Sequence, residues 1–302
     1  MLRFRSTKLR LVCCIAVAHV FPYVSLAMAT FSSSSSCGSS GSLSGKRVLI
    51  TGGGRGIGRA IALNVASRGA SVVVVSRTKD EIEAVVREAK HVAHNDAVML
   101  ALTADVTDEQ SVNAAVKAAV VEMGGIDILI NNAGRGSSKK GPLWEQDAAD
   151  FQGLMDTNVL SVFLVSRAVL KESMLAIGSG DIINISSKAG KVGLAKIGPY
   201  VASKFAVEGL TACLAVELQD AGSGEIRVNS ISPGMVDTRS FPKAPGRIGV
   251  RTAESCMLGI DLLLGSDVTG HYVHVDELDS ALAAGKEPSA ALKSINEPDF
   301  HP

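Results

Sequence analysis

From residue 46 onward, the chain alternates short, continuously apolar runs with longer segments whose apolar residues recur every three or four positions. The short runs lack the polar alternation of a half-exposed strand, so they predict strands that are buried on both faces. Helical segments lie between them, the longest at about residues 147–177 and 199–222. The strands are expected at residues 46–51, 71–76, 97–106, 126–134, 181–187, 225–234 and 270–276. The pattern predicts an α/β fold of the doubly wound (Rossmann) type, a mostly parallel seven-stranded sheet in a single domain with helices on both faces.

Composition narrows the classes of protein further. The 302 residues are 46% hydrophobic but only 4% aromatic, which favours a core of valine, isoleucine, leucine and alanine and argues against disorder. The 30 basic and 30 acidic residues balance, so there is no electrostatic sign of nucleic-acid binding. The five scattered cysteines contain no C-x2-C pair, and the histidine pairs His91/His94 and His271/His274 lack accompanying carboxylate ligands. No metal site is therefore predicted.

The head of the chain differs from the body. Six of the 30 basic residues precede residue 48 and the first acid is Asp80, which leaves 24 basic against 30 acidic residues in the body. Residues 1–29 combine a basic start, an uncharged apolar run and a small-residue site at Ala27-Met28-Ala29, as signal and transit segments do. Unpaired cysteines argue against secretion, so an organelle (plastid, mitochondrion or endoplasmic reticulum) is the expected destination. A retained membrane anchor and a cytoplasmic protein that starts at Met28 are the alternatives.

The remaining boundaries follow from changes in composition. Residues 30–44 form a Ser/Gly-rich linker that is unable to bury a core. The globular domain is expected at residues 45–276, and residues 277–302 form a C-terminal extension.

A glycine-rich turn joins the first predicted strand to the first helix. It reads Thr51-Gly52-x3-Gly56-Ile57-Gly58, with Arg55 inside it. Glycine permits a tight turn and lets the backbone approach a pyrophosphate at the helix N-terminus, so a dinucleotide site is expected, with a plain strand–helix turn as the alternative. In NAD-binding sites, a carboxylate at the end of the second strand accepts the ribose 2′-hydroxyl. This chain has Ser76-Arg77 at that place and no carboxylate. Arg77 and Arg55 instead offer guanidinium groups to a 2′-phosphate, so NADP(H) is predicted to be preferred over NAD(H).

A second group of residues points to proton transfer. Tyr200 and Lys204 are four residues apart and therefore share one helix face. Tyrosine is a poor acid or base at neutral pH because its ordinary pKa is about 10, and a nearby ammonium group would bring that pKa closer to neutrality. Ser187 ends the fifth predicted strand, where its hydroxyl can hydrogen-bond a carbonyl oxygen.

Together these motifs resemble the short-chain dehydrogenase/reductase family over about residues 45–276. They occur in the family's order, at its usual separations: Thr51-Gly52-x3-Gly56-x-Gly58, Asn131-Asn132-Ala133-Gly134, Ser187, Tyr200-Val-Ala-Ser-Lys204 and Pro233-Gly234. The resemblance implies strand order 3-2-1-4-5-6-7 and hydride transfer between NAD(P) and a carbonyl or secondary alcohol, with a ketone of the 3-oxoacyl type among the candidate substrates. In this family the helices at 150–177 and around Tyr200 pair between subunits, so a homodimer or homotetramer is expected.

The resemblance also implies residue roles. Tyr200 would protonate the substrate oxygen, Lys204 would hold the nicotinamide ribose and lower the Tyr200 pKa, and Ser187 would orient the carbonyl. Asn158 would hold a water in a proton relay. Asp105 would meet the adenine, Asn132 would steady the strands near the cofactor, and Thr238 would contact the carboxamide. The remaining cofactor contacts implied are Val106, Ala133, Gly134, Pro233 and Gly234.

Two features depart from the family pattern. The last strand continues as Val275-Asp276-Glu277-Leu278 where Val-Asp-Gly-Gly is usual, and the segment after Pro233 is short for a substrate lid. Both leave the substrate open. A catalytically silent nucleotide-binding sensor or scaffold is the alternative function, but it would have no need of the full Ser/Tyr/Lys set. A methyltransferase would leave the Tyr/Lys pair unexplained.

Overall fold

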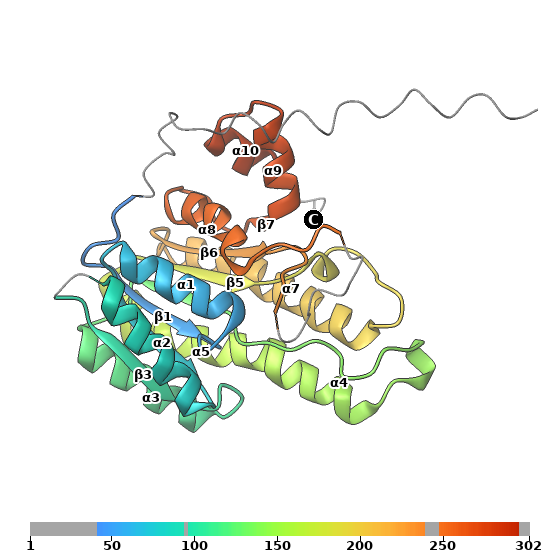
Figure 1. Cartoon of the computed structure of the whole chain (residues 1–302), viewed down its shortest axis with the longest axis horizontal. Helices are drawn as coiled ribbons and strands as arrows, with labels where there is room; N and C mark the ends of the chain where they lie inside the picture. The colour runs from blue at the N-terminus through green and yellow to red at the C-terminus, as the bar shows by residue number, and fades with distance from the viewer. Residues whose placement is uncertain (1–40, 94–95, 239–247, 296–302) are drawn as a thin grey trace, which may run out of the picture. The chain divides into compact units, whose positions relative to one another are not determined.

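The computed structural model describes residues 41–93, 96–238 and 248–295. Seven parallel strands form one sheet in the order β3-β2-β1-β4-β5-β6-β7, which confirms the predicted topology (Figure 1). The strands are β1 (Arg47–Thr51), β2 (Ser71–Ser76), β3 (Met99–Thr103), β4 (Ile128–Asn131), β5 (Gly180–Ile185), β6 (Ile226–Ser232) and β7 (Tyr272–His274). The sheet order reverses between β1 and β4, and ligands of such sheets bind beyond the carboxyl ends of the strands at this point.

Two hydrophobic cores lie on opposite faces of the sheet. Successive residues of a strand point to opposite faces, so Val48 and Ile50 join one core while Leu49 joins the other. The first core includes α1 (Gly56–Ser67), α2 (Lys79–Val92), α8 (Met257–Leu264), α9 (Val275–Ala283) and α10 (Pro288–Ser294). The second includes α3 (Glu109–Met123), α5 (Ser161–Val169) and α7 (Gly198–Asp220). Among the described residues, none of the helices combines the length and the apolar character that crossing a membrane requires.

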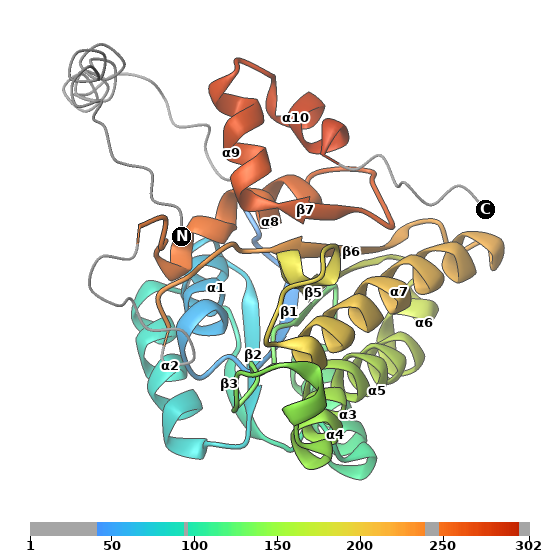
Figure 2. The ribbon, with the colours of Figure 1, turned by 90° about the vertical axis from the view of Figure 1, so that its right-hand side faces the viewer.

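The predicted helical region at 147–177 is one continuous helical segment that contains two π-helical turns. It consists of α4 (Ala148–Met155), a π-turn (Asp156–Leu160), α5, a second π-turn (Leu170–Met174) and α6 (Leu175–Ile177). Short 3₁₀ turns lie at η1 (Leu143–Glu145), η4 (Lys188–Gly190) and η5 (Ala253–Cys256). In Figure 2, α4 lies beside the first turns of α7, with which it is in contact.

The ends of the domain differ from the prediction. The seventh strand is shorter than 270–276 because the His274 imidazole caps the next helix: its Nδ1 accepts a hydrogen bond from the Asp276 amide at 3.1 Å, and α9 begins at Val275. The boundary expected at residue 276 therefore lies inside α9, and Leu278 and Leu292 of the extension are buried in the first core. At the other end, Leu43 is also buried in that core, although it was assigned to the linker. The predicted targeting segment, residues 1–29, lies outside the described residues.

Candidate active site

The glycine turn between β1 and α1 has the backbone that a phosphate cradle requires. Gly52 and Gly56 have φ angles of 63° and 54°, in the left-handed region that glycine tolerates without strain. A Cβ atom on Gly58 would lie 2.4 Å from the Asn132 Nδ2 atom and 2.6 Å from the Gly52 carbonyl oxygen, so no larger residue fits there. Helix α1 starts at Gly56 without a side-chain cap and without an acid in its first turn. Its first amides therefore remain available to an anion, which fits the diphosphate of a dinucleotide.

The end of β4 holds this turn in place. The Asn132 side-chain amide donates to the carbonyl oxygens of Thr51 and Gly52, both at 3.0 Å. In return, the Thr51 hydroxyl accepts from the backbone amides of Asn132 and Ala133, both at 3.1 Å. These bonds couple the cradle to β4. The chain continues from β4 to Gly134, where a Cβ atom would lie 3.3 Å from the Asn158 Oδ1 atom and 4.0 Å from the Lys204 Nζ atom, so Gly134 is close to both side chains. The Ile57 side chain packs against the first core, which leaves only its backbone to face the cradle.

The two arginines expected at a 2′-phosphate lie at the carboxyl edge of the sheet, each beside an acid. Arg55 is 3.3 Å from Glu81, and Arg77 is 3.8 Å from Asp105. Exposed ion pairs of this kind contribute little stability, so both guanidinium groups can reorient toward a ligand. The Asp105 carboxylate accepts hydrogen bonds from the backbone amide and the hydroxyl of Thr107. These bonds lower the pKa of Asp105, and the charge of Arg77 adds to the effect, whereas burial opposes it.

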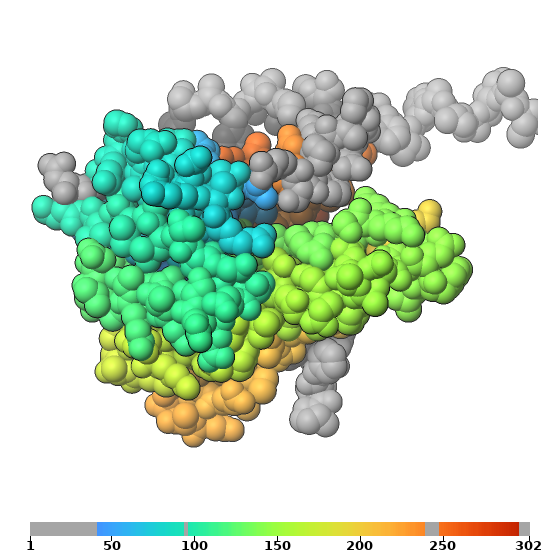
Figure 3. Space-filling view, turned by 90° about the horizontal axis from the view of Figure 1, so that it is seen from below, coloured from blue at the N-terminus to red at the C-terminus, as the bar shows by residue number. Residues whose placement is uncertain are grey.

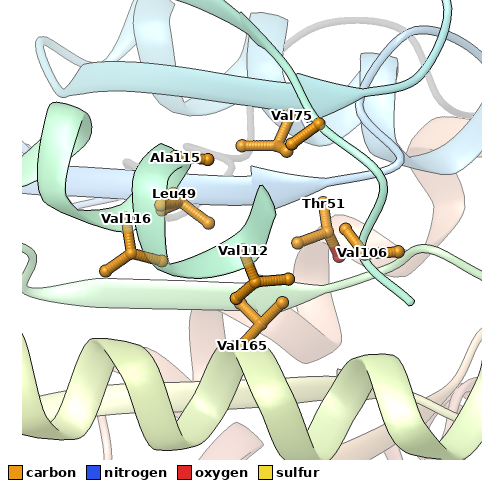
Figure 4. Close-up of a pocket in the computed structure, with 9 residues that line it drawn as sticks. Leu49, Thr51, Val75, Val106, Val112, Ala115, Val116 and Val165 are labelled. Atoms are coloured by element: carbon orange, nitrogen blue, oxygen red, sulfur yellow. The ribbon is translucent and has the colours of Figure 1, made fainter. Parts of the chain in front are cut away.

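Val106 has a different position from the one expected of a contact residue. Its side chain is buried and lines a small pocket between the sheet and α3 (Figure 4). Among the described residues that line this pocket, Thr51 carries the one polar side chain. The pocket is therefore part of the apolar core, and Val106 can reach a ligand only through its backbone.

The predicted Ser, Tyr and Lys side chains come together at the carboxyl end of β5. Ser187 follows β5, and its hydroxyl hydrogen-bonds the Tyr200 phenol and accepts from the Ala189 amide at 3.2 Å. Lys204 is buried, donates to the Ile185 carbonyl oxygen at 2.8 Å, and lies with its Nζ atom 5.9 Å from the centre of the Tyr200 ring. The three side chains thus form one cluster in which the phenol is flanked by a hydroxyl and a cation.

Burial decides the charge states in this cluster. It raises the pKa of the Tyr200 phenol, and the hydrogen bond with Ser187 offsets this only in part. The net shift is therefore upward, and the lowering of the Tyr200 pKa by Lys204 stays a prediction. Burial also lowers the pKa of Lys204 to about 8, while the nearby Glu208 carboxylate raises it. Removing either charged form from water is unfavourable, which is why both groups are shifted toward neutrality.

Asn158 lies in the first π-turn, with its side chain buried. Its Oδ1 atom accepts from the Arg135 amide at 2.8 Å, and its Nδ2 atom donates to the Arg135 carbonyl oxygen and the Ser203 hydroxyl, both at 3.0 Å. Ser203 in turn donates to the Tyr200 carbonyl oxygen at 2.7 Å. The π-turn thereby ties the loop after β4 to the helix that carries Tyr200, consistent with the frequent occurrence of such turns at functional sites.

The loop after β6 lies against the glycine turn. A Cβ atom on Gly56 would be 3.2 Å from the Thr238 Cγ2 atom, while Pro233 and Gly234 begin this loop. Arg251 holds this loop in place. Its backbone amide donates to the Met235 carbonyl oxygen at 2.8 Å, and its side chain forms ion pairs with Asp276 and Asp279 of α9, both at 2.6 Å. Sequence reasoning missed Arg251. No local pattern pointed to it, because its acidic partners, Asp276 and Asp279, lie on α9.

The structure divides the predicted residues into two groups along one edge of the sheet. The cradle and the Ser/Tyr/Lys cluster meet around Gly134, whereas Arg55, Arg77 and Asp105 lie toward β2 and β3. The space-filling view shows a hollow between the segments of α2 and α4 (Figure 3). Within residues 41–93, 96–238 and 248–295, there is no group of three or more His, Cys, Asp or Glu side chains able to hold a metal ion.

Comparisons with known proteins agree with this arrangement. The family model described as short chain dehydrogenase matches residues 46–245. The NADPH-dependent pterin aldehyde reductase of Arabidopsis thaliana is 38% identical over 64% of this chain and 76% of its own length. The 3-alpha-(or 20-beta)-hydroxysteroid dehydrogenase of Mycobacterium tuberculosis (strain CDC 1551 / Oshkosh) is 41% identical over 66% of this chain and 72% of its own length.

A solved structure shows the same fold. The crystal structure of levodione reductase superposes with a TM-score of 0.70 and 33% identity, covering 80% of this chain and 99% of that one. With the sheet order, the glycine cradle and the Ser/Tyr/Lys cluster in place, the chain belongs to the short-chain dehydrogenase/reductase family, as an NAD(P)-dependent oxidoreductase acting on CH–OH groups.

Proposed function

We propose that this protein is an NADPH-dependent reductase of small carbonyl compounds, with ketones of the 3-oxoacyl type among the substrates to test. The observation that carries the proposal is the Ser187–Tyr200–Lys204 cluster beside the glycine cradle. Gly52, Gly56 and the first amides of α1 would hold the diphosphate, while Lys204 would hold the nicotinamide ribose. The bound cofactor supplies a hydride to the carbonyl carbon. Ser187 orients the carbonyl oxygen, and the Tyr200 phenol donates a proton to it.

Burial keeps the Tyr200 phenol protonated at neutral pH, which is the form that the reduction of a carbonyl requires. The raised pKa makes the phenol a weaker acid, so Ser187 and Lys204 beside it would have to assist the proton transfer. The proton lost by Tyr200 must be replaced from solvent, and a water near Asn158 is proposed to relay it.

The preference for NADPH rests on the edge beyond β2. Ser76-Arg77 offers no carboxylate to a 2′-hydroxyl, and Arg77 with Arg55 offers two guanidinium groups to a 2′-phosphate. A relative that is 38% identical is named as NADPH-dependent, which supports the same choice.

Two further proposals concern assembly and location. Phe151, Phe163 and Phe205, on α4, α5 and α7, are each more than 40% exposed, and exposed aromatic residues on neighbouring helices favour a self-complementary interface. We therefore expect a homodimer or homotetramer. Residues 1–29 are proposed to direct the protein to an organelle before removal, with translation from Met28 as the alternative.

The test of function is a reductase assay on the purified protein. NADPH consumption is followed by absorbance with a panel of matched aldehydes, simple ketones, 3-oxoacyl thioesters and hydroxysteroid ketones, and NADH serves as the parallel cofactor. Turnover with at least one carbonyl compound, with NADPH favoured, supports the proposal. Tight NADPH binding without turnover of any compound would favour the silent nucleotide-binding alternative.

A further inference from the structure

Two loops at the carboxyl end of the sheet expose large apolar side chains to solvent. In the loop after β4, Leu143 is 70% exposed and Trp144 is 85% exposed. In the loop after η4, Val192 is 40% exposed and Leu194 is 41% exposed. Single exposed apolar side chains need no explanation, but a contiguous group of them marks a binding surface.

The two loops lie side by side, so these side chains are contiguous. The Gly141 amide donates to the Lys196 carbonyl oxygen at 3.0 Å, which joins one loop to the other. A Cβ atom on Gly198, the first residue of α7, would lie 3.1 Å from the Leu143 Cδ1 atom. Figure 1 shows both loops projecting on the same side of the molecule, beyond α4 and α7. The four apolar side chains therefore belong to one surface, which borders Tyr200, two residues beyond Gly198.

Positive charge accompanies this apolar group. Residues 137–144 and 187–198 contain five lysines and no acid, and the acid that follows the first of these segments is Glu145. Lys191 is paired with Glu208 at 3.4 Å. Each of the other four is exposed and forms no ion pair with a described residue: Lys139, Lys140, Lys188 and Lys196. We call these four lysines and the four apolar side chains the loop surface.

The composition of the loop surface matches the interface of an anionic membrane. Apolar side chains enter the boundary between headgroups and acyl chains, where an indole ring is favoured because it is apolar with one polar N–H group. Lysine side chains lie along the apolar layer while their ammonium groups stay at the anionic headgroups. A second copy of the chain fits poorly, because a two-fold interface would bring the same positive surface against itself.

We infer that the loop surface docks on membranes rich in anionic lipids. In the docked state, Leu143 and Trp144 lie in the headgroup boundary and the four lysines contact the lipid phosphates. Docking turns the side of the molecule that carries Tyr200 toward the bilayer, where apolar compounds partition. The inference goes beyond the proposed reductase function, since it concerns where the protein binds and not what it reduces.

The test uses the full-length protein and its single tryptophan. Trp144 is the one tryptophan in the sequence, so its fluorescence reports on the loop surface alone, whatever residues 1–29 do at a membrane. Vesicles are made of phosphatidylcholine alone or of an equal mixture with phosphatidylserine, each with and without brominated acyl chains that quench tryptophan on contact. With the mixed vesicles, the Trp144 emission should shift to the blue and be quenched by the brominated chains. With phosphatidylcholine alone at the same lipid concentration, neither change should occur.

Variants show whether the lysines and the apolar side chains are responsible. Each lysine near an anionic surface raises the affinity about fivefold, so Lys139→Gln combined with Lys140→Gln should raise the lipid concentration for half-maximal quenching about 25-fold. Leu143→Gln should raise it several-fold, because an apolar side chain is lost from the boundary. The matched control combines Lys90→Gln on α2 with Lys286→Gln after α9, which removes the same charge from exposed positions outside the loop surface. The control should change the half-maximal concentration by less than about twofold.

Three results would overturn the inference. The first is a Trp144 emission that mixed vesicles neither shift nor quench, or an equal loss of quenching in the control and in the lysine variant. The second is a blue shift that grows with protein concentration without lipid, which would assign the loop surface to a second copy. The third is a Trp144 emission changed by a single-stranded DNA oligonucleotide but not by vesicles. Because no step needs NADPH or a carbonyl compound, this outcome is separate from that of the reductase assay.

Discussion

At Gly58 the backbone of the turn itself leaves no room for a side chain, so Gly58→Ala tests the cradle directly. The added methyl carbon would lie 2.4 Å from the Asn132 Nδ2 atom, 2.6 Å from the Gly52 carbonyl oxygen and 2.9 Å from the Gly53 Cα atom. Two of these three atoms are backbone atoms of the turn, so relief by a side-chain rotation alone is excluded. The turn must open, or Asn132 must leave its place.

The cost follows from the contacts that would be lost. Overpacking of this kind costs about 1–3 kcal/mol. Displacing the Asn132 amide removes two hydrogen bonds to Thr51 and Gly52, each contributing about 1 kcal/mol. A loss of about 3 kcal/mol lowers the melting temperature of a domain this size by roughly 6–12 °C. NADPH affinity should fall at least tenfold, because the cradle itself is distorted.

Gly209→Ala is the matched control. Gly209 lies within the long helix α7, and a Cβ atom there would have nothing within 4 Å. The same substitution should therefore stabilise the protein by about 0.5–1 kcal/mol, since alanine favours the helix. Thermal unfolding and NADPH titration of both variants provide the comparison. A Gly58→Ala protein that melts within about 2 °C of the wild type and binds NADPH normally would refute the reasoning.

Four other outcomes are expected. Tyr200→Phe keeps the ring but removes the proton donor, so NADPH affinity should persist while turnover falls by about 10² or more; undiminished reduction would exclude Tyr200 as the acid. Arg77→Asp should weaken NADPH binding and relatively favour NADH, and a wild type that already prefers NADH would contradict the assigned cofactor. Arg251→Met breaks both ion pairs to α9, which hold the loop after β6. The KM for the cofactor should rise in steady-state kinetics, while calorimetry should show only a small drop in the melting temperature. Deleting residues 1–40 should leave folding and activity intact. Deleting residues 1–44 should lower the melting temperature, because Leu43 is buried and the Gly41 carbonyl oxygen accepts two hydrogen bonds from Arg68. Equal melting temperatures of the two deletion variants would show that the contacts of residues 41–44 are dispensable.

Most of the strands were predictable because they are runs of apolar residues, which the two-sided burial of a parallel sheet requires; β6 is the exception, since Arg227 and Asn229 interrupt its apolar positions. Their ends were not. Residues 104–106 and 132–134 continue the apolar or motif pattern past the last paired residue, so the sequence alone does not show where pairing stops. The seventh strand is cut short by a histidine cap, and no general rule for apolar runs would reveal that.

The site residues were predictable from spacing, but their energetics were not. The spacing of Tyr200 and Lys204 places them on one helix face, yet only the structure shows that both are buried deeply enough for burial to dominate their pKa values. Arg251 was invisible for another reason. Its partners lie about 25 residues away on α9, and an isolated arginine carries no local pattern.

The reversal of strand order at β1 has a consequence for the newly made chain. β1 can pair with β2 soon after synthesis, since Val48 is opposite Val72, but its other edge must wait for β4, where Val48 is opposite Ile128. The salt bridge between Arg47 and Asp127 that borders this second pairing joins residues 80 positions apart. At about 5–20 residues per second, the ribosome takes roughly 4–16 s to supply the missing strand. Throughout that time the backbone N–H and C=O groups on one edge of β1 are unpaired, and the strand carries the apolar side chains of Val48, Leu49 and Ile50. The middle of the finished sheet is therefore a part of the nascent chain that is exposed to pairing with the wrong strand.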